Sequence, residues 1–231
     1  MDVDPEEDPI PRLIYLEAMT GYDQTENARR LEMLRSYLSP GFTIDTLRPA
    51  DGPKILEQPE DFAQMHRAAL GAVKGVAPHA CGAIIAGGAV DPGLDALRAA
   101  ARVPVIGPGE ASLYLARLLG SRLAILTVEP AVPGAYAMIQ HVAAKPDVVI
   151  VCPMKTTVRK ILADPDEGRR VMREAAAAAI REDKADVLYL GSMTQGTLGI
   201  TQDLRAQFGV PVLDPLPVSI RTAEQAAAAR G

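Results

Sequence analysis

Two short glycine-containing segments carry the residue types from which a reaction could be built. Gly87-Gly88 follows the apolar run Ala83–Ala86, and Gly191-Ser192 follows the apolar run Val187–Leu190. The Ser192 hydroxyl could act as a nucleophile, donate a hydrogen bond to a substrate, or belong to a residue that merely fills a small space. No His or Asp partner stands near Ser192 in the sequence, so direct contact with a substrate is the better prediction.

The backbone N–H groups of these two segments could also bind a substrate. Gly87 and Gly88 have no side chains to shield their amides, which could bind a carboxylate or a developing oxyanion. The alternative is that they are plain turn glycines. We expect Met193 and Thr194 to offer the matching N–H donors in the second segment.

Further candidates stand where other apolar runs end. Glu17 follows Leu13–Leu16, and it is either a general base on water or carbon or a solvated loop carboxylate. Thr127 ends the run from Arg122 and could bind a substrate oxygen. Glu110 is interpreted as an acidic residue in the first turn of a helix.

The cysteines and histidines suggest neither thiol chemistry nor a metal site. Cys152 is expected to be a buried, inert thiol in an edge strand, and Cys81 lies before a strand, far from the cleft. His66 and His141 fall on predicted helices and His79 in a loop, so no metal-ligand spacing is present.

The elements that must position these groups form a repeat. Each glycine-containing segment stands between a buried apolar strand and an amphipathic helix, and a second short strand with the sequence Val-Pro-Val follows, at Val103–Val105 and Val210–Val212. This pattern is typical of a βαβ unit. Its repetition predicts an α/β protein with two pseudo-symmetric doubly wound lobes, parallel sheets, and the active site in the cleft between the lobes.

The expected organisation is a first lobe over residues 10–112 plus 215–231, a second lobe over 113–214, and a disordered lead-in over 1–9. The chain has 231 residues, 48% of them hydrophobic and 23% charged, with a net charge of −5. We therefore expect no nucleic-acid partner, and no membrane partner because no apolar run reaches roughly 18 residues. The acidic N-terminus is unlike a signal peptide, which favours a cytoplasmic protein.

The chain resembles the aspartate/glutamate racemase superfamily, and within it the hydantoin racemase branch. The matching segments are Asp91–Arg98, Val103–Gly107 with Gly109-Glu110-Ala111, Leu190-Gly191 and Gly209–Asp214. The resemblance implies two lobes, no cofactor, a small-molecule substrate and a homo-oligomer. It also implies two cysteines, one in each lobe, that move a proton to and from a carbon next to a carbonyl.

The chain departs from this pattern at both cysteines. It has Gly87 or Gly88 at the first position, because the loop is a residue longer, and Ser192 at the second. A thiol titrates near ~8.5, whereas a serine hydroxyl is a far weaker acid and glycine has no side-chain proton.

The sequence therefore leads us to expect a cofactor-independent hydrolytic or lyase-type enzyme. Its substrate would be a small carbonyl compound, either a hydantoin- or thiohydantoin-like ring or a short carboxylate. Glu17 would activate water or take a proton, while Ser192 and the N–H groups near Gly88 and Thr194 hold the oxyanion. The alternatives are a racemase or isomerase of hydantoin-like or amino-acid-like substrates that uses other bases, and an inactive small-molecule binding protein.

Overall fold

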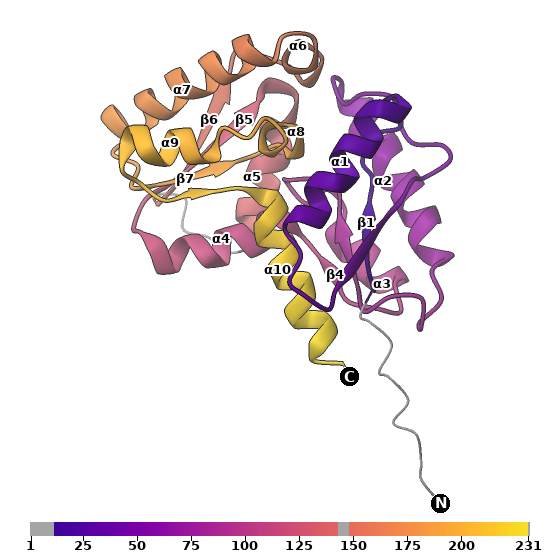
Figure 1. Ribbon diagram of the computed structural model, residues 1–231. Coiled ribbons are helices and arrows are strands. Elements are labelled where there is room, and N and C mark those ends of the chain that lie inside the picture. The colour runs from indigo at the N-terminus through magenta and orange to yellow at the C-terminus, as the bar shows by residue number, and fades with distance from the viewer. Residues whose placement is uncertain (1–11, 143–147, 231) are drawn as a thin grey trace, which may run out of the picture.

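The structure is a computed structural model that describes residues 12–142 and 148–230, and these form two lobes (Figure 1). The expected lead-in over 1–9 lies outside the described residues. Lobe 1 is built on a parallel sheet of order β2-β1-β3-β4, and lobe 2 on a parallel sheet of order β6-β5-β7-β8. The strands are β1 Arg12–Leu16, β2 Thr43–Leu47, β3 Ala83–Ala86, β4 Val105–Ile106, β5 Leu123–Val128, β6 Val149–Met154, β7 Val187–Leu190 and β8 Val212–Leu213.

Helices connect the strands and cover the sheets. They are α1 Gln24–Ser36, α2 Pro59–Lys74, α3 Leu94–Ala100, α4 Pro108–Leu119, the 3-10 turn η1 Glu129–Ala131, α5 Val132–His141, α6 Val158–Ala163, α7 Pro165–Arg181, α8 Met193–Gly196, α9 Thr201–Phe208 and α10 Pro215–Ala228. The two sheets have the same strand order, with β1 to β4 corresponding to β5 to β8. The predicted fold class is thereby confirmed.

The central strands form where the sequence is continuously apolar. All four residues of β3 and all four residues of β7 are buried. Each of these strands pairs on one side with a two-residue edge strand, β4 or β8. The prolines before those edge strands accept equivalent hydrogen bonds, Ile84 N to Pro104 O and Leu188 N to Pro211 O, both at 2.9 Å. Proline is tolerated there because an edge strand leaves N–H positions unpaired.

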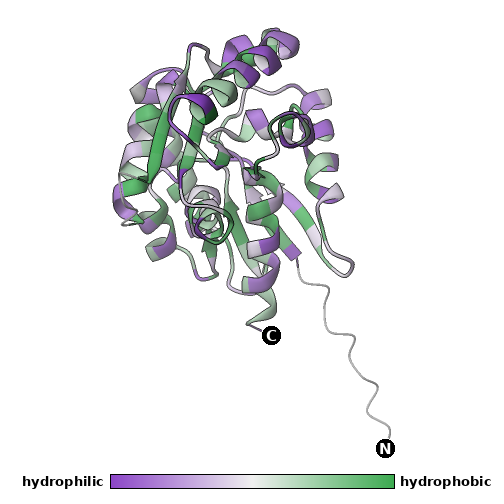
Figure 2. Ribbon diagram, turned by 90° about the vertical axis from the view of Figure 1, so that its left-hand side faces the viewer, coloured by the Kyte–Doolittle hydropathy of each residue, from purple (hydrophilic) through white to green (hydrophobic). Residues whose placement is uncertain are grey.

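The outer helices are amphipathic. In α7 the buried residues Gly168, Met172, Ala176 and Ala179 share one face, and the Asp164 side chain caps the helix by accepting a hydrogen bond from Glu167 N. Figure 2 shows the consequence for the whole molecule, with hydrophobic strands in the interior and hydrophilic residues on the outer helices. Burial of these apolar faces is the main force that holds helices to the sheets.

Two helices tie the lobes together. The chain leaves lobe 1 through α4, which packs on β7 of lobe 2, and returns through α10, which packs on β3 and β4 of lobe 1. The two helices also pack against each other, and one hydrophobic core includes residues of both sheets. Figure 1 shows α10 in yellow beside lobe 1. The lobes are therefore positioned relative to each other by packed helices.

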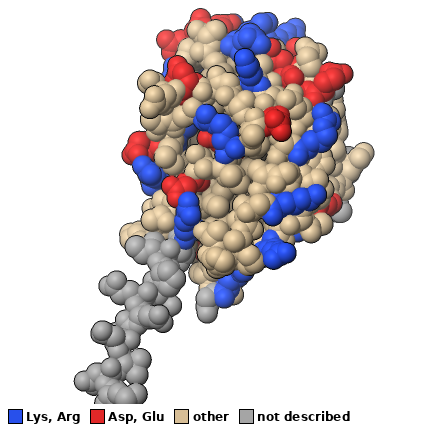
Figure 3. Space-filling view, turned by 90° about the vertical axis from the view of Figure 1, so that its right-hand side faces the viewer, with Lys and Arg blue, Asp and Glu red and all other residues tan. Residues whose placement is uncertain are grey.

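One face of the molecule, shown in Figure 3, carries charged side chains of both signs. On the face shown in Figure 3, basic and acidic side chains are interspersed and do not gather by sign. No helix among the described residues is long and apolar enough to span a bilayer.

Candidate active site

A cavity lies between the lobes at the carboxyl ends of the central strands, with about 760 Å³ of empty space, part of which is open solvent. Residues Gly87–Val90, which follow β3, form its first wall, and residues Gly191–Thr194, which follow β7, form its second wall. Glu17, Ala18 and Met19, which follow β1, lie beside the first wall. The structure thus brings both glycine-containing segments and Glu17 to one site.

The rest of the cavity is mostly apolar. Its polar side chains outside the two walls are few, and the apolar ones come from both lobes, so the cavity suits a small ligand with an apolar substituent. The main apolar lining residues are Leu34, Leu56, Phe62, Met65, Val128 and Val158.

Strand register shows which residues of the two walls correspond. In lobe 1 the last residue of β3 pairs with Leu16 at the end of β1, and in lobe 2 the last residue of β7 pairs with Leu126 of β5. Two residues beyond the ends of β3 and β7, Gly88 corresponds to Ser192. One residue beyond the paired leucines, Glu17 corresponds to Thr127. Of the two glycines that the sequence left open, Gly88 is therefore the one that corresponds to Ser192.

Gly87 allows the backbone that follows β3 to lie close to the backbone at the end of β1. A Cβ atom at Gly87 would overlap the carbonyl oxygen of Leu16 and lie 2.9 Å from Ala18 N. Its counterpart Gly191 is less tightly confined, since a Cβ there would lie 2.9 Å from the Thr127 Cβ and 3.1 Å from the carbonyl oxygen of Leu126. A Cβ at Gly88 would instead meet the Pro92 ring at 2.7 Å, which is side chain and not backbone. The backbone around Gly87 therefore leaves no room for a side chain, whereas at Gly88 only the Pro92 ring would have to move.

Glu17 is held in a defined orientation. It is 8% exposed, its N–H donates to Leu47 O at 2.9 Å, and its Oε2 accepts a hydrogen bond from Arg48 Nε at 2.5 Å. Within the part of the chain that the structure describes, its Oε1 accepts no hydrogen bond. Among the described residues that line the cavity, Glu17 is the one carboxylate. It leaves one oxygen free to accept a proton.

Ser192 stands at the start of α8 with an extended backbone, φ −148° and ψ 134°. Its carbonyl accepts hydrogen bonds from Gln195 N and Gly196 N, whereas its Oγ bonds to no other described residue. Met193 and Thr194 begin α8, where the first amides of a helix have no acceptor within the helix itself. The second wall therefore presents a free hydroxyl together with two backbone donors.

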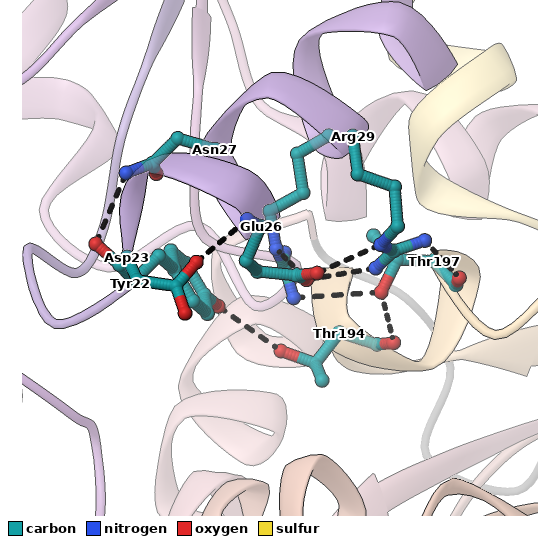
Figure 4. A network of polar contacts seen from close by, with 8 residues as sticks. Tyr22, Asp23, Glu26, Asn27, Arg29, Thr194 and Thr197 are labelled. Carbon is teal, nitrogen blue, oxygen red and sulfur yellow. Dashed lines mark hydrogen bonds and ion pairs between the residues drawn. The ribbon is translucent and has the colours of Figure 1, made fainter.

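The second wall is tied to lobe 1 by a polar network around the N-terminus of α1 (Figure 4). The Tyr22 hydroxyl and Thr194 Oγ1 are 3.5 Å apart, at the limit of a hydrogen bond. Arg29 donates a hydrogen bond to the carbonyl of Thr197 at 3.2 Å, and Arg30 donates one to Thr197 Oγ1 at 3.4 Å. Glu26 binds both guanidinium groups at 2.7 Å, which fixes them on the helix.

The first wall is tied to lobe 2 in return. The buried Tyr189 of β7 donates from its hydroxyl to the carbonyl of Ala89 at 2.6 Å. Asp91 accepts hydrogen bonds from Gly109 N at 2.9 Å and Glu110 N at 2.5 Å, in the first turn of α4. Each wall of the cavity is therefore fixed by elements of the opposite lobe.

Two tyrosines and an arginine complete the polar lining. The Arg30 guanidinium lies 3.9 Å from the centroid of the Tyr22 ring, a cation–π contact. Burial raises the pKa of Tyr22 and of Tyr15 above the ordinary phenol value, although the Arg30 charge partly opposes this. Both phenols are therefore neutral hydrogen-bonding groups at physiological pH.

Thr127 does not reach the cavity. It is fully buried, and its hydroxyl donates to the carbonyl of Gly191 at 3.0 Å. The expected contact with a substrate is replaced by support of the second wall. The physical reason is length, because Glu17 occupies the corresponding place in lobe 1 with a side chain long enough to reach the cavity.

The other candidates are placed outside the cavity. Glu110 forms an ion pair with Arg98 at 2.8 Å in the first turn of α4. Burial raises the pKa of Cys81, and burial together with the Asp183 charge raises the pKa of Cys152 to about 11, so both thiols are protonated. No cluster of three or more metal-ligating side chains occurs among the described residues.

Sequence reasoning missed Tyr22, Arg30, Arg48 and Asp91. Tyr22 and Arg30 stand on or beside α1, and a helix gives no signal in its own sequence of which cavity it will line. Arg48 and Asp91 act through partners that are distant along the chain, at Glu17 and at Gly109. The backbone of Asp91 has a positive φ of 52°, which is uncommon for a non-glycine residue and indicates that a specific contact holds it.

Comparisons with known proteins agree with this architecture. The chain is 31% identical over 144 residues to the hydantoin racemase of Pseudomonas sp. (strain NS671), a match covering 58% of this chain and 53% of that protein. It is 27% identical over 135 residues to the hydantoin racemase of Paenarthrobacter aurescens, covering 58% and 56%. The matched region thus spans about half the length of these two curated relatives. The crystal structure of allantoin racemase from Pseudomonas fluorescens aligns with a TM-score of 0.82 at 25% identity, covering 95% of this chain and 92% of that one.

These findings correct the expectation of hydrolytic or lyase-type chemistry. The relatives are named for racemisation, which supports the isomerase alternative and contradicts the hydrolase or lyase prediction. The hydrolase or lyase prediction was wrong because it rested on the two missing thiols alone. The model of the Asp/Glu/Hydantoin racemase family matches residues 26–223, and the chain belongs to that family.

Proposed function

We propose that this protein is a racemase that inverts a stereocentre next to a carbonyl, in a hydantoin-like ring carrying an apolar substituent. One observation carries the proposal: Glu17 is the one carboxylate among the described cavity residues, and its Oε1 has no described hydrogen-bond partner. Family membership supports isomerisation, and the apolar lining supports an apolar ring substituent.

Proton transfer is assigned to Glu17. Its carboxylate removes the proton from the ring carbon, and the electron pair of the broken C–H bond moves to the neighbouring carbonyl as an enolate. Ser192 and the backbone amides of Met193 and Thr194 hold the enolate oxygen with hydrogen bonds. The planar intermediate turns over in the cavity, and the protonated Glu17, which stays on one side, then returns the proton to the face opposite to the original one. This restores the carboxylate and yields the other enantiomer, whereas return of the proton without turnover regenerates the substrate.

A single base is proposed because the second wall has no suitable acid. A serine hydroxyl that gave up its proton would leave an alkoxide, which is far less stable than the thiolate formed by the family's cysteine. Ser192 therefore donates a hydrogen bond and keeps its proton.

The test is a pair of measurements on each enantiomer of 5-benzylhydantoin in heavy water. Loss of optical rotation together with deuterium at the ring carbon, and with part of the original hydrogen retained in the inverted product, is the expected result. A ring-opened product would overturn the proposal. Binding without exchange, seen as line broadening alone, would also overturn it and identify a binding protein. Glu32→Gln, a change on the exposed side of α1, is the control variant.

A further inference from the structure

The loop that forms the first wall is anchored at a residue outside the cavity. Asp91 has a left-handed backbone, φ 52°, which L residues rarely adopt. Its N–H donates to Gly88 O at 3.0 Å, so the loop closes on itself between the wall and the anchor. Its carboxylate accepts hydrogen bonds from Gly109 N and Glu110 N of α4. Any movement of the carboxylate is therefore transmitted to Gly88 through a short turn.

The corresponding carboxylate in lobe 2 comes from another position. Asp214, the counterpart of Gly107 after the Val-Pro-Val strand, accepts hydrogen bonds from Leu216 N at 3.0 Å and from Thr201 Oγ1 at 2.9 Å. In lobe 1 a Cβ at Gly107 would lie 2.6 Å from Asp91 Oδ2, so the Asp91 carboxylate fills this place. Both α4 and α10 thus begin at an enclosed carboxylate. For α10 it is Asp214, whereas for α4 it is Asp91, from the loop that forms the first wall.

We propose that Asp91 is a positioning residue, whose ionised carboxylate holds the first wall of the cavity against α4 and so sets its position relative to Ser192. A helix cap alone does not require this arrangement, since an aspartate at position 107 would cap α4 as Asp214 caps α10. The proposal depends on the proposed function only in treating the first wall as part of the substrate site.

The groups around the carboxylate make its ionisation observable. The pKa of Asp91 is raised to about 7, chiefly by burial and in part by the Glu110 charge, against the lowering effect of the two backbone hydrogen bonds and of Arg98. Tyr189 faces Asp91 from β7 as a neutral phenol. Below this pH a proton occupies one carboxylate oxygen, and one of the two α4 amides loses a good acceptor.

The experiment is a pH titration of the full chain followed by the backbone amide resonances, without any ligand. We expect Gly88 and Ala89 of the wall to shift with the same midpoint near 7 as Gly109 and Glu110. In Asp91→Asn the shared midpoint should vanish, and hydrogen exchange of the residue 91 amide, which donates to Gly88 O, should accelerate about tenfold, the loss of about 1.4 kcal/mol of protection.

Asp186→Asn is the matched control, because Asp186 also accepts backbone hydrogen bonds, from Ser121 N and Arg122 N, but at the opposite end of its sheet. It should change the resonances near Ser121 and leave the wall unchanged. Titration of Gly109 and Glu110 without Gly88 and Ala89 would overturn the proposal and leave Asp91 as a helix cap. Since no substrate is used, this result stands whether or not racemisation is found.

Discussion

The hydroxyl of Tyr189 in lobe 2 donates a hydrogen bond to the carbonyl of Ala89 in lobe 1, at 2.6 Å, and both residues are buried. Together with the Tyr22–Thr194 contact in the other direction, it makes the cavity a property of the two lobes jointly. A wall held by the opposite lobe moves when the lobes move. The spacing of the reacting groups therefore depends on packing between lobes as much as on the loops themselves.

Removing this hydroxyl tests the inter-lobe anchor. Tyr189→Phe keeps the buried ring but takes a donor from the Ala89 carbonyl, so we expect the free energy of unfolding to fall by about 1–3 kcal/mol. Urea denaturation measures the change. Tyr114→Phe, on the exposed side of α4, is the control and should leave the unfolding midpoint where it is. Equal stability of Tyr189→Phe and the wild type would show that the anchor contributes nothing.

The register of the walls predicts where thiols can be introduced. Gly88→Cys combined with Ser192→Cys places one thiol on each side of the cavity, and we expect faster exchange of the ring proton than in the wild type. The new Cβ at position 88 must displace the Pro92 ring, at a cost of about 1–3 kcal/mol.

The comparison variant is Gly87→Cys, whose Cβ overlaps the Leu16 carbonyl. Because backbone cannot yield as a side chain can, its thermal midpoint should fall well below that of Gly88→Cys. Calorimetry of the two single variants measures these midpoints. A Gly87→Cys protein as stable as the wild type would show that the correspondence of Gly88 with Ser192 is wrong.

Much of the fold follows from the sequence because parallel strands have an unmistakable pattern. Ala83–Ala86 and Val187–Leu190 are apolar at every position, which, in short runs followed by glycine, is typical of a strand covered on both faces. The carboxyl ends of parallel strands share one edge, which explains why Glu17, Gly88 and Ser192 meet at one cavity.

The remaining parts of the site depend on tertiary distances that no local pattern encodes. Thr127 lies near the end of β5, at the place that Glu17 has in lobe 1, yet its short side chain donates a hydrogen bond to Gly191 O and does not reach the cavity. Arg30 lines the cavity only because α1 approaches α8. Asp91 finds its partner 18 residues further along the chain, beyond a helix and a strand. Patterns identify elements and their ends, whereas contacts between elements require the packed structure.

Glu17 is the residue whose loss should stop the reaction. Glu17→Gln keeps the size of the side chain and removes the base, so we expect ring-proton exchange to slow by about 10²–10⁴-fold with little change in substrate affinity. Arg48→Gln keeps the Glu17 carboxylate but removes the guanidinium that orients it, and we expect ring-proton exchange to slow by about tenfold. Exchange in heavy water measures both. Unchanged exchange in Glu17→Gln would remove Glu17 from the mechanism and leave no carboxylate in the described cavity to replace it.

The pH dependence of stability should carry the signature of Asp91. In the folded protein its pKa is raised from 3.8 to about 7, chiefly by burial, so the folded state keeps a proton that the unfolded chain releases. The stabilising contribution is therefore complete below about pH 4 and is lost as the pH rises to about 7. The slope is at most about 1.4 kcal/mol per pH unit.

Asp91→Asn lacks this titration, and the difference between its unfolding free energy and that of the wild type isolates the contribution. Burial raises the pKa of Asp214 in the same direction, but that group titrates in both proteins and cancels. Urea denaturation from pH 4.5 to 8 should show the wild type losing stability relative to Asp91→Asn as the pH rises. A constant difference over this range would mean that the folded protein does not retain the proton on Asp91. If the wild type does lose stability relative to Asp91→Asn as the pH rises, stability and wall position have opposite pH optima, since the ionised carboxylate that best holds the α4 amides is also the charge that burial penalises.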